Sequence, residues 1–386
     1  MAMSEARFPR PHYELEGTVV ILVGEPGETG PIYTRLLATS PRGPHRGTLF
    51  LTAEVYRDVG FTGPVFPIWR SSDDGRNWEH VSDVRDERFG FGNRYQPTLY
   101  ELPREFAGLP AGTLLLAGSA IPPDMSETHL VLYSSIDGAA TWSFVSEIDS
   151  GGAAVYDPAA DAITTAIWEP DLSLVGNDLV CAYADERYKE GSMLQTLVHR
   201  SSGNLIDWSD RVLDFGVPDS FTRPGMFVST GELPDGTYRA VFELVGPPNV
   251  PVHFASSPDG ADWGSPESIG VSLISDSGTT LAGSPNLAWR STSDDRVEIL
   301  VTGRLSLERD GSPSNSALFN ADGGSDVWQS VPLPVQSARE LDGENSGYSQ
   351  SLVWTDDGSI VQATTVRNQH GSHDIVVARA VQTYRQ

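Results

Sequence analysis

Two glutamates interrupt stretches that otherwise have the composition of buried strands. Glu169 stands between Trp168 and Pro170 at the head of the apolar run IWEPDLSLVGNDLVCAYADER, and Glu243 interrupts RAVFELVG. A carboxylate within an apolar strand needs a partner or a function. Two carboxylates in one pocket are what glycoside hydrolysis requires: one protonates the leaving oxygen, and the other attacks the anomeric carbon or activates water.

This chemistry requires carboxylates with different pKa values, because one must stay protonated while the other is ionised. We expect the flanking Trp168 and Pro170 to favour a protonated Glu169. Arg223 is the cation that we expect to hold Glu243 ionised. Whether these residues share a pocket depends on the elements that carry them.

Two sequence patterns recur with a regular period. The first is a turn that ends in tryptophan: RSSDDGRNW, SIDGAATW and SSPDGADW follow S-x-D-x-G-x-x-W to different degrees, and SSGNLIDW and ADGGSDVW are degraded versions. The second is an apolar, β-branched run bounded by turn residues, the composition of a strand. Its six copies are spaced 60 to 65 residues apart by subtraction and begin at Gly47, Gly112, Gly176, Gly236, Arg296 and Gly358.

These repeats predict an all-β fold. A period of about 60 residues accommodates four antiparallel strands, and radial packing of six such sheets leaves only short edges. We therefore predict a six-bladed β-propeller with four-stranded antiparallel blades, formed by residues 1–386 as one domain. We expect the N- and C-terminal strands to close the ring, with Thr18 to Val23 paired with the C-terminal segment.

A third pattern places Glu169 beside the axis of this ring. A five-residue segment precedes each repeated strand: YTRLL, YQPTL, WEPDL, TRPGM, GSPNL and YSQSL. Four of the six have proline at the third position, which marks an edge strand because proline cannot donate to a ladder. The innermost strand of a blade is such an edge. The second position predicts a polar ring of Thr34, Gln96, Glu169, Arg223, Ser284 and Ser349.

Aromatic residues at the first position, Tyr33, Tyr95, Trp168 and Tyr348, lie next to this polar ring. The residues seven positions after the start of each repeated strand predict a second ring: Glu54, Ser119, Tyr183, Glu243, Gly303 and Thr365. Aromatic faces beside polar groups suit a sugar. The predicted substrate contacts are Tyr33, Arg35, Gln96, Trp168, Asp185, Arg223 and Tyr348. Asp185 also belongs to the charge cluster Asp185 to Arg187, for which a solvated or self-paired strand end is the alternative role.

Composition narrows the possible partners. The formal net charge of −26 repels nucleic-acid phosphates and anionic membranes and favours a neutral substrate. The single cysteine, Cys181, excludes an internal disulfide and a cysteine metal cluster. We expect no metal or organic cofactor, because carboxylate chemistry needs none, and we expect a monomer. No apolar run approaches the ~18 residues of a membrane span, and no signal peptide is visible, so the sequence predicts a soluble protein.

The order WEPDL, YADER, LVHRSSGNLIDW, TRPGMFV and YRAVFELVG resembles glycoside hydrolase family 93, and the tryptophan turns are similar to the Asp boxes of sialidases and their relatives. The similarity is strongest from Trp168 to Gly246. It implies a retaining exo-α-1,5-L-arabinanase that releases arabinobiose from linear arabinan, with Glu169 as general acid/base, Glu243 as nucleophile and Tyr348 lining the pocket. The family also implies secretion, whereas the N-terminus leaves open an intracellular enzyme that trims arabino-oligosaccharides.

Two other functions stay open at this point. A sialidase would use an arginine triad, for which Arg35, Arg223 and Arg304 are candidates, with Tyr348 as nucleophile. The leucine that follows Arg35 departs from the R-I-P strand of that family. A non-catalytic sugar-binding propeller would repeat its binding residues in every blade, whereas the predicted rings are asymmetric.

Overall fold

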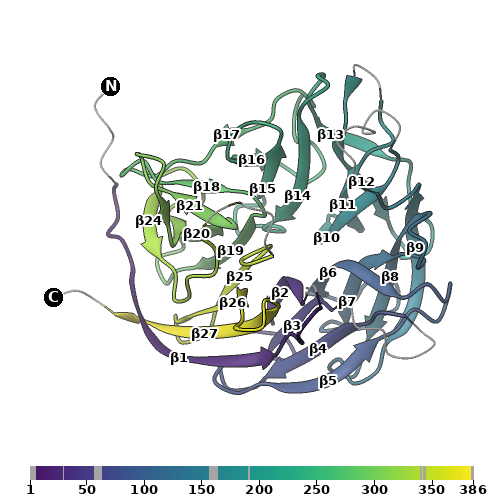
Figure 1. Cartoon of the computed structure of the whole chain (residues 1–386), viewed down its shortest axis with the longest axis horizontal. Helices are drawn as coiled ribbons and strands as arrows, with labels where there is room; N and C mark the ends of the chain where they lie inside the picture. Colours follow the sequence, from purple (N-terminus) through teal and green to yellow (C-terminus); the bar gives the residue numbers. More distant parts are fainter. Residues whose placement is uncertain are drawn as a thin grey trace.

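A computed structural model describes residues 6–28, 30–55, 63–155, 164–189, 192–339, 341 and 345–383. Within these ranges the chain forms 27 strands, arranged in six four-stranded sheets and one three-stranded sheet. Figure 1 shows the sheets around a central axis, with β2, β6, β10, β14, β19 and β25 innermost. The predicted all-β propeller is confirmed, and no helix in the described ranges has the length and apolar character needed to cross a membrane.

The first three blades follow chain order from the axis outward. Blade 1 contains β2 (Ile32–Ala38), β3 (Leu49–Glu54), β4 (Phe66–Ser71) and β5 (Glu79–Val84). Blade 2 contains β6 (Asn93–Glu101), β7 (Leu114–Ala120), β8 (Thr128–Ser135) and β9 (Ser143–Gly151). Blade 3 contains β10 (Ile167–Val175), β11 (Asp178–Asp185), β12 (Thr196–Ser202) and β13 (Val212–Gly216).

Blade 4 contains β14 (Arg223–Ser229), β15 (Tyr238–Val245), β16 (Val252–Ser257) and β17 (Val271–Ser272). Blade 5 contains β19 (Asn286–Ser291), β20 (Val297–Thr302), β23 (Ser316–Asn320) and β24 (Gln329–Pro332), together with the three-stranded sheet of β18 (Thr280–Ala282), β21 (Leu305–Leu307) and β22 (Pro313–Ser314). Blade 6 contains β25 (Ser351–Trp354), β26 (Ile360–Arg367), β27 (His373–Thr383) and β1 (His12–Leu22). The six repeated strands of the sequence are thus β3, β7, β11, β15, β20 and β26, the second strand of each blade.

Blade 6 joins the two ends of the chain. β1 pairs antiparallel with β27, with Thr18 opposite Ala378 and Val20 opposite Val376. The predicted pairing of the N-terminal strand with the C-terminal segment is confirmed, although β1 ends at Leu22, one residue before the predicted end. A sheet built from both termini ties the first and last repeats together by main-chain hydrogen bonds.

Blade 5 departs from the predicted four-stranded pattern. Its innermost strand is divided into β18 and β19 by Gly283, Ser284 and Pro285, and its second strand is divided into β20 and β21 at Gly303 and Arg304. Proline lacks the N–H that would continue the ladder, and Gly283 has a φ of 64°, which favours glycine. The two inner strands of this blade therefore break at the same level.

A hydrophobic core fills the space between each pair of neighbouring blades, because each sheet buries both faces against its neighbours. Representative pairs are Phe66 and Leu116, Leu132 and Leu172, Phe215 and Phe242, Phe254 and Ile299, Phe319 and Trp354, and Leu51 and Val377. The last pair joins blade 6 to blade 1, so packing contacts run around the whole ring.

The tryptophan turns lie at the opposite end of the blades from Glu169. In blade 1, Ser71 pairs with Leu49, which pairs with Ala38 at the far end of the innermost strand. Asp73 accepts a hydrogen bond from the Asn77 N–H at 2.8 Å. These turns therefore hold the hairpins and are remote from the candidate site.

Candidate active site

A residue with left-handed backbone lies near the start of the innermost strand of every blade. These residues, with φ between 43° and 63°, are Tyr33, Gln96, Glu169, Met226, Ser284 and Ser349. Each coincides with a bulge or break, such as the skipped pairing between Trp168 and Asp171 in blade 3. Left-handed backbone is unfavourable by about 1–2 kcal/mol for a side chain with a Cβ atom, so compensating contacts are expected.

Hydrogen bonds between neighbouring blades supply that compensation. In blades 2 to 5 the backbone N–H of the left-handed residue donates to a side-chain oxygen of the preceding blade. A carboxylate acceptor makes such a bond strong. The bonds, donor first, are Gln96 N–H to Glu54 Oε1 (2.7 Å), Glu169 N–H to Gln96 Oε1 (3.1 Å), Met226 N–H to Glu169 Oε2 (2.6 Å) and Ser284 N–H to Glu243 Oε2 (2.6 Å). The bulges therefore fix both sequence-predicted glutamates in position.

Glu169 and Glu243 lie close together beside Gly225. Both residues are buried: Glu169 is 9% exposed and Glu243 is 8% exposed. A Cβ atom placed on Gly225 would lie 3.2 Å from Glu169 Oε2 and 3.8 Å from Glu243 Oε1. The two oxygens are therefore at most about 7 Å apart, the sum of these distances, which is within reach of one sugar linkage.

The surroundings of the two carboxylates make Glu169 the one that stays protonated. Burial, and then the charge of Glu243, raise the pKa of Glu169 to about 8. Burial also raises the pKa of Glu243, but the Ser284 N–H and the Arg304 guanidinium act in the opposite direction. The protonated Glu169 agrees with the sequence-based expectation, whereas the cation that favours the ionised Glu243 is Arg304 and not Arg223.

Arg223 instead belongs to a buried frame between blades 3 and 4. Its Nη2 donates to Glu186 Oε1 and, at 2.8 Å, to Gln195 Oε1. Gln195 Nε2 donates to the Pro224 carbonyl at 2.7 Å, and Trp168 Nε1 donates to Glu186 Oε1 at 3.0 Å. This frame fixes the indole of Trp168 and the backbone beside Gly225.

The aromatic residues predicted to contact a sugar have different surroundings. Trp168 is half-buried, with its ring centroid 6.3 Å from that of Tyr95. Burial, and then the carboxylates of Glu169, Glu243 and Glu54, raise the pKa of Tyr348, so its hydroxyl stays protonated. A protonated hydroxyl among carboxylates can donate a hydrogen bond.

Tyr33 and Arg35 are both buried and contact each other. Arg35 Nη2 donates to Tyr33 Oη at 3.0 Å, and its guanidinium lies 4.3 Å from the centre of the Tyr33 ring. Arg35 Nη1 donates to Ser349 Oγ, and the rings of Tyr33 and Tyr348 are 6.2 Å apart. These two predicted substrate contacts therefore support Tyr348 and the innermost strands.

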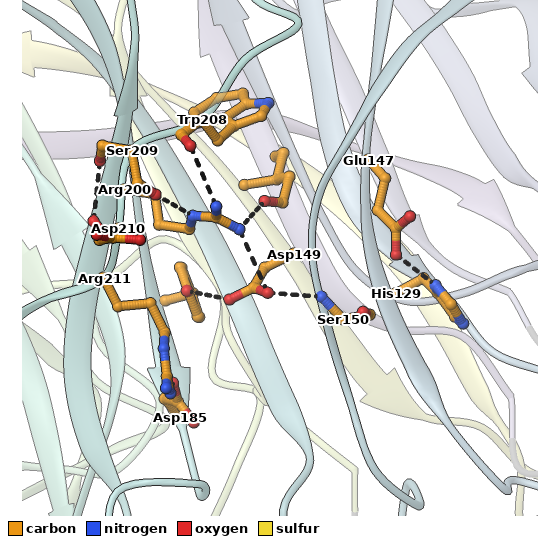
Figure 2. Close-up of polar contacts among 12 residues, drawn as sticks. His129, Glu147, Asp149, Ser150, Asp185, Arg200, Trp208, Ser209, Asp210 and Arg211 are labelled. Carbon is orange, nitrogen blue, oxygen red and sulfur yellow. Dashed lines mark hydrogen bonds and ion pairs between the residues drawn. The ribbon is translucent and has the colours of Figure 1, made fainter.

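Asp185 belongs to a buried ion-pair network at the end of β11, where it pairs with Ile167. Asp185 is fully buried at the end of β11, and its carboxylate accepts hydrogen bonds from Arg187 Nε at 2.9 Å and from Arg211 Nη1 at 2.7 Å. Figure 2 shows Asp185 beside Arg211, near the contact between Asp149 and Arg200. These contacts support the self-paired alternative through Arg187, but Asp185 is buried rather than solvated and also pairs with Arg211 from outside the cluster.

The predicted inner ring is correct in four blades and wrong in two. In blade 1 the bulge residue is Tyr33, not Thr34, and in blade 4 it is Met226, not Arg223. Blade 1 lacks the proline that marks the position in blades 2, 3 and 5. In blade 4, Pro224 lies two residues before the bulge, because the edge strand tolerates proline at more than one position.

In the second predicted ring, the residue that occupies the ring position differs by one from the predicted residue in blades 3 and 5. Glu54, Ser119 and Glu243 lie opposite Ile32, Tyr95 and Gly225, the residues just before the bulge. The equivalent residue of blade 3 is Ala184, which pairs with Trp168, and not Tyr183. In blade 5, Arg304 occupies this position instead of Gly303, since its N–H donates to the Gly283 carbonyl. This shift of one residue is why Arg304 was not assigned to Glu243 from the sequence.

Comparison with solved structures identifies close relatives along almost the whole chain. An α-L-arabinofuranosidase of Fusarium graminearum, solved with an iminosugar inhibitor, is 30% identical with a TM-score of 0.80, and the match covers 95% of this chain and 98% of that chain. The same enzyme, described as a GH93 α-L-arabinofuranosidase, has been solved with arabinobiose, and that structure matches with a TM-score of 0.79 at 30% identity over 95% of this chain and 98% of that one.

A third relative is an α-L-arabinanase of Penicillium chrysogenum complexed with arabinobiose. It is 30% identical with a TM-score of 0.80, over 97% of this chain and 99% of that chain. No protein-family model and no curated protein sequence matches the chain. These matches are 30% identical and cover 95% or more of this chain, and the chain therefore belongs to glycoside hydrolase family 93.

Proposed function

We propose that this glycoside hydrolase is a retaining exo-arabinanase. It cleaves α-1,5-linked L-arabinan or arabino-oligosaccharides and releases arabinobiose, with Glu169 as general acid/base and Glu243 as nucleophile. The observation that carries this proposal is the pair of buried carboxylates within about 7 Å, of which Glu169 has a pKa of about 8.

The two steps use each carboxyl group in turn. Glu243 attacks the anomeric carbon while Glu169 gives its proton to the leaving oxygen, so a glycosyl-enzyme ester forms as the linkage breaks. Glu169, now ionised, removes a proton from water, which attacks the same carbon and releases Glu243. Two displacements at one carbon leave its configuration unchanged.

The separation of the carboxylates supports retention. Retaining enzymes hold the two groups roughly 5–5.5 Å apart, whereas inverting enzymes need roughly 6.5–9.5 Å to admit a water molecule. The upper bound of about 7 Å between Glu169 Oε2 and Glu243 Oε1 includes the retaining distance. The half-buried Trp168 next to Glu169 offers an aromatic face to a sugar ring.

The choice of arabinan rests on the relatives and on charge. Two of them were solved with arabinobiose, and the formal net charge of −26 disfavours a polyanionic chain. Because the proposed site is formed by neighbouring blades of one ring, we also propose that the chain acts as one domain and as a monomer. A polymeric cell-wall substrate favours action outside the cell.

The two other functions have less support. The arginines of a sialidase triad would have to clamp a carboxylate, but Arg35 binds Tyr33 and Ser349, and Arg223 binds Glu186 and Gln195. A repeated sugar-binding propeller is disfavoured because the six bulge residues include only one carboxylate, Glu169.

Product analysis on linear α-1,5-arabinan tests the proposal. We expect arabinobiose as the first product, with its anomeric configuration retained in NMR spectra recorded early in the reaction. An aryl sialoside serves as the comparison substrate and should not be hydrolysed. An inverted product would contradict the double displacement, and cleavage of the sialoside alone would contradict the substrate class.

Replacing Gly225 by alanine should reduce activity without unfolding the protein. Gly225 does not have left-handed backbone, so alanine is compatible with its conformation, but the new Cβ would lie 2.9 Å from Gln195 Nε2 and 3.2 Å from Glu169 Oε2. Displacing Glu169 by even part of an ångström misaligns proton transfer. We expect kcat/KM on arabinan to fall by about 10- to 100-fold.

The matched control is Gly17→Ala in β1, where a Cβ would meet nothing within 4 Å. This variant should keep wild-type kcat/KM. The melting temperature of both variants should be measured, since extra volume in a packed site costs about 1–3 kcal/mol. Full activity of Gly225→Ala would show that the space between the two carboxylates is not used.

A further inference from the structure

We propose that Phe221 is a stacking platform for a sugar unit of the substrate chain that lies beyond the cleaved linkage. This inference rests on the proposed function and extends it to the preferred chain length. Phe221 lies in the connection between β13 and β14, four residues before Gly225. Four residues of chain span at most about 14 Å, so its backbone is within a few sugar units of the two carboxylates.

Phe221 is unusual among the apolar residues of the surface. It is 59% exposed, and the other large hydrophobic side chains exposed in the described ranges are aliphatic. Most of the aromatic side chains of the propeller are buried or half-buried in the cores between blades. Phe221 therefore presents a flat apolar face to solvent on the side of the ring that carries Glu169 and Glu243.

Hydrogen bonds hold this exposed residue in place. Asp219 accepts hydrogen bonds from the N–H groups of Phe221 at 2.8 Å and Thr222 at 2.6 Å, and from Thr222 Oγ1 at 2.9 Å. From the other side, Gly246 approaches so closely that a Cβ there would lie 2.3 Å from the Phe221 carbonyl oxygen. An aromatic ring on a fixed backbone loses little conformational entropy when a ligand binds.

A sugar is the ligand that fits this position. The faces of a sugar ring carry C–H groups that pack on an aromatic ring, while its hydroxyl groups stay in water. A neutral sugar is also compatible with the strongly acidic chain, whereas an anion would be repelled. Phe221 lies in the connection just before β14, and its carbonyl oxygen lies against Gly246, three residues after Glu243. This place at the margin of the site suits a sugar unit beyond the cleaved linkage rather than the unit held by the two carboxylates.

The experiment compares a long with a short substrate. We expect the ratio of kcat/KM on linear α-1,5-arabinan to kcat/KM on α-1,5-arabinotriose to fall by about threefold to tenfold in Phe221→Ala, the range of one aromatic contact. Phe221→Trp should keep the wild-type ratio because it keeps an aromatic face. The matched control is Ile206→Ala, equally exposed at 58% but located in a turn at the opposite end of blade 3, and its ratio should not change.

Each outcome is decisive. An unchanged ratio in Phe221→Ala, or an equal fall in Phe221→Trp, overturns the platform while leaving the proposed function intact. If the wild-type chain cleaves neither substrate, the proposed function fails and the platform fails with it. Melting temperatures should be nearly unchanged because Phe221 is mostly exposed, so a lower ratio does not reflect unfolding.

Discussion

Glu243→Gln is expected to lower kcat/KM on linear α-1,5-arabinan by at least about 10⁴-fold, the order seen when a covalent nucleophile is removed. The amide cannot attack the anomeric carbon, but its carbonyl oxygen can still accept the Ser284 N–H that Glu243 Oε2 now accepts at 2.6 Å. The fold and the bulge at Ser284 should therefore persist. The measurements are kcat/KM, from the rate at which product forms on arabinan, and the melting temperature of each variant.

Two further variants make this result specific. Glu79→Gln removes a carboxylate on β5, where Glu79 pairs with Arg70 at the outer edge of blade 1, and should retain full activity. Glu243→Ala leaves space for azide, which should attack an activated aryl arabinoside from the face that Glu243 used and give the inverted glycosyl azide. More than one per cent residual activity in Glu243→Gln would contradict its assignment as nucleophile.

Glu169→Gln is expected to lower kcat/KM on arabinan by about 10²- to 10⁴-fold, the contribution of general acid catalysis. The loss should be much smaller for a nitrophenyl arabinoside, because a nitrophenolate leaves without needing a proton. This dependence on the leaving group separates a proton donor from a residue that only holds the fold. Equal losses on both substrates would contradict the role of Glu169.

The pH profile gives the same assignment independently. Glu169 must be protonated to act first, and its pKa of about 8 means that this form is present below pH 8 and is lost as the pH rises through that value. Wild-type kcat/KM on arabinan should therefore fall near pH 8. The fall should be absent in Glu169→Gln, whose residual activity has no such proton to lose. A wild-type profile that stays flat from pH 7 to pH 9 would exclude Glu169 as the acid.

Much of the fold follows from local sequence signals. Six apolar runs at a period of about 60 residues predict six sheets, and each run is the second strand of its blade. The pairing of Thr18 with the C-terminal segment was also predictable, because a ring of repeats whose last unit is incomplete needs a strand from the other end. Turn residues and apolar periodicity act over a few residues, and a single sequence displays them directly.

The register of the inner strands was only partly predictable. Proline marks the bulge in blades 2, 3 and 5, where it directly follows the left-handed residue, as Pro170 follows Glu169. In blade 4, Pro224 precedes the left-handed Met226 by two residues instead of following it. The prediction based on proline therefore chose Arg223, three residues before Met226. A bulge adds one unpaired residue without a characteristic residue type, and a shift of one residue turns every side chain to the other face.

By itself, the sequence determined that the chain is a ring of six β-sheets and that Glu169 and Glu243 are the carboxylates to consider, because a charge in an apolar strand is visible without coordinates. Only the tertiary structure decided what surrounds them. Both carboxylates lie beside Gly225, Arg304 rather than Arg223 acts on Glu243, and Asp185 accepts hydrogen bonds from two arginines. The contacts of Arg304 with Glu243 and of Gly225 with Glu169 join residues that are far apart in sequence but lie on neighbouring blades. Their geometry depends on how each bulge aims a backbone N–H at the neighbouring blade.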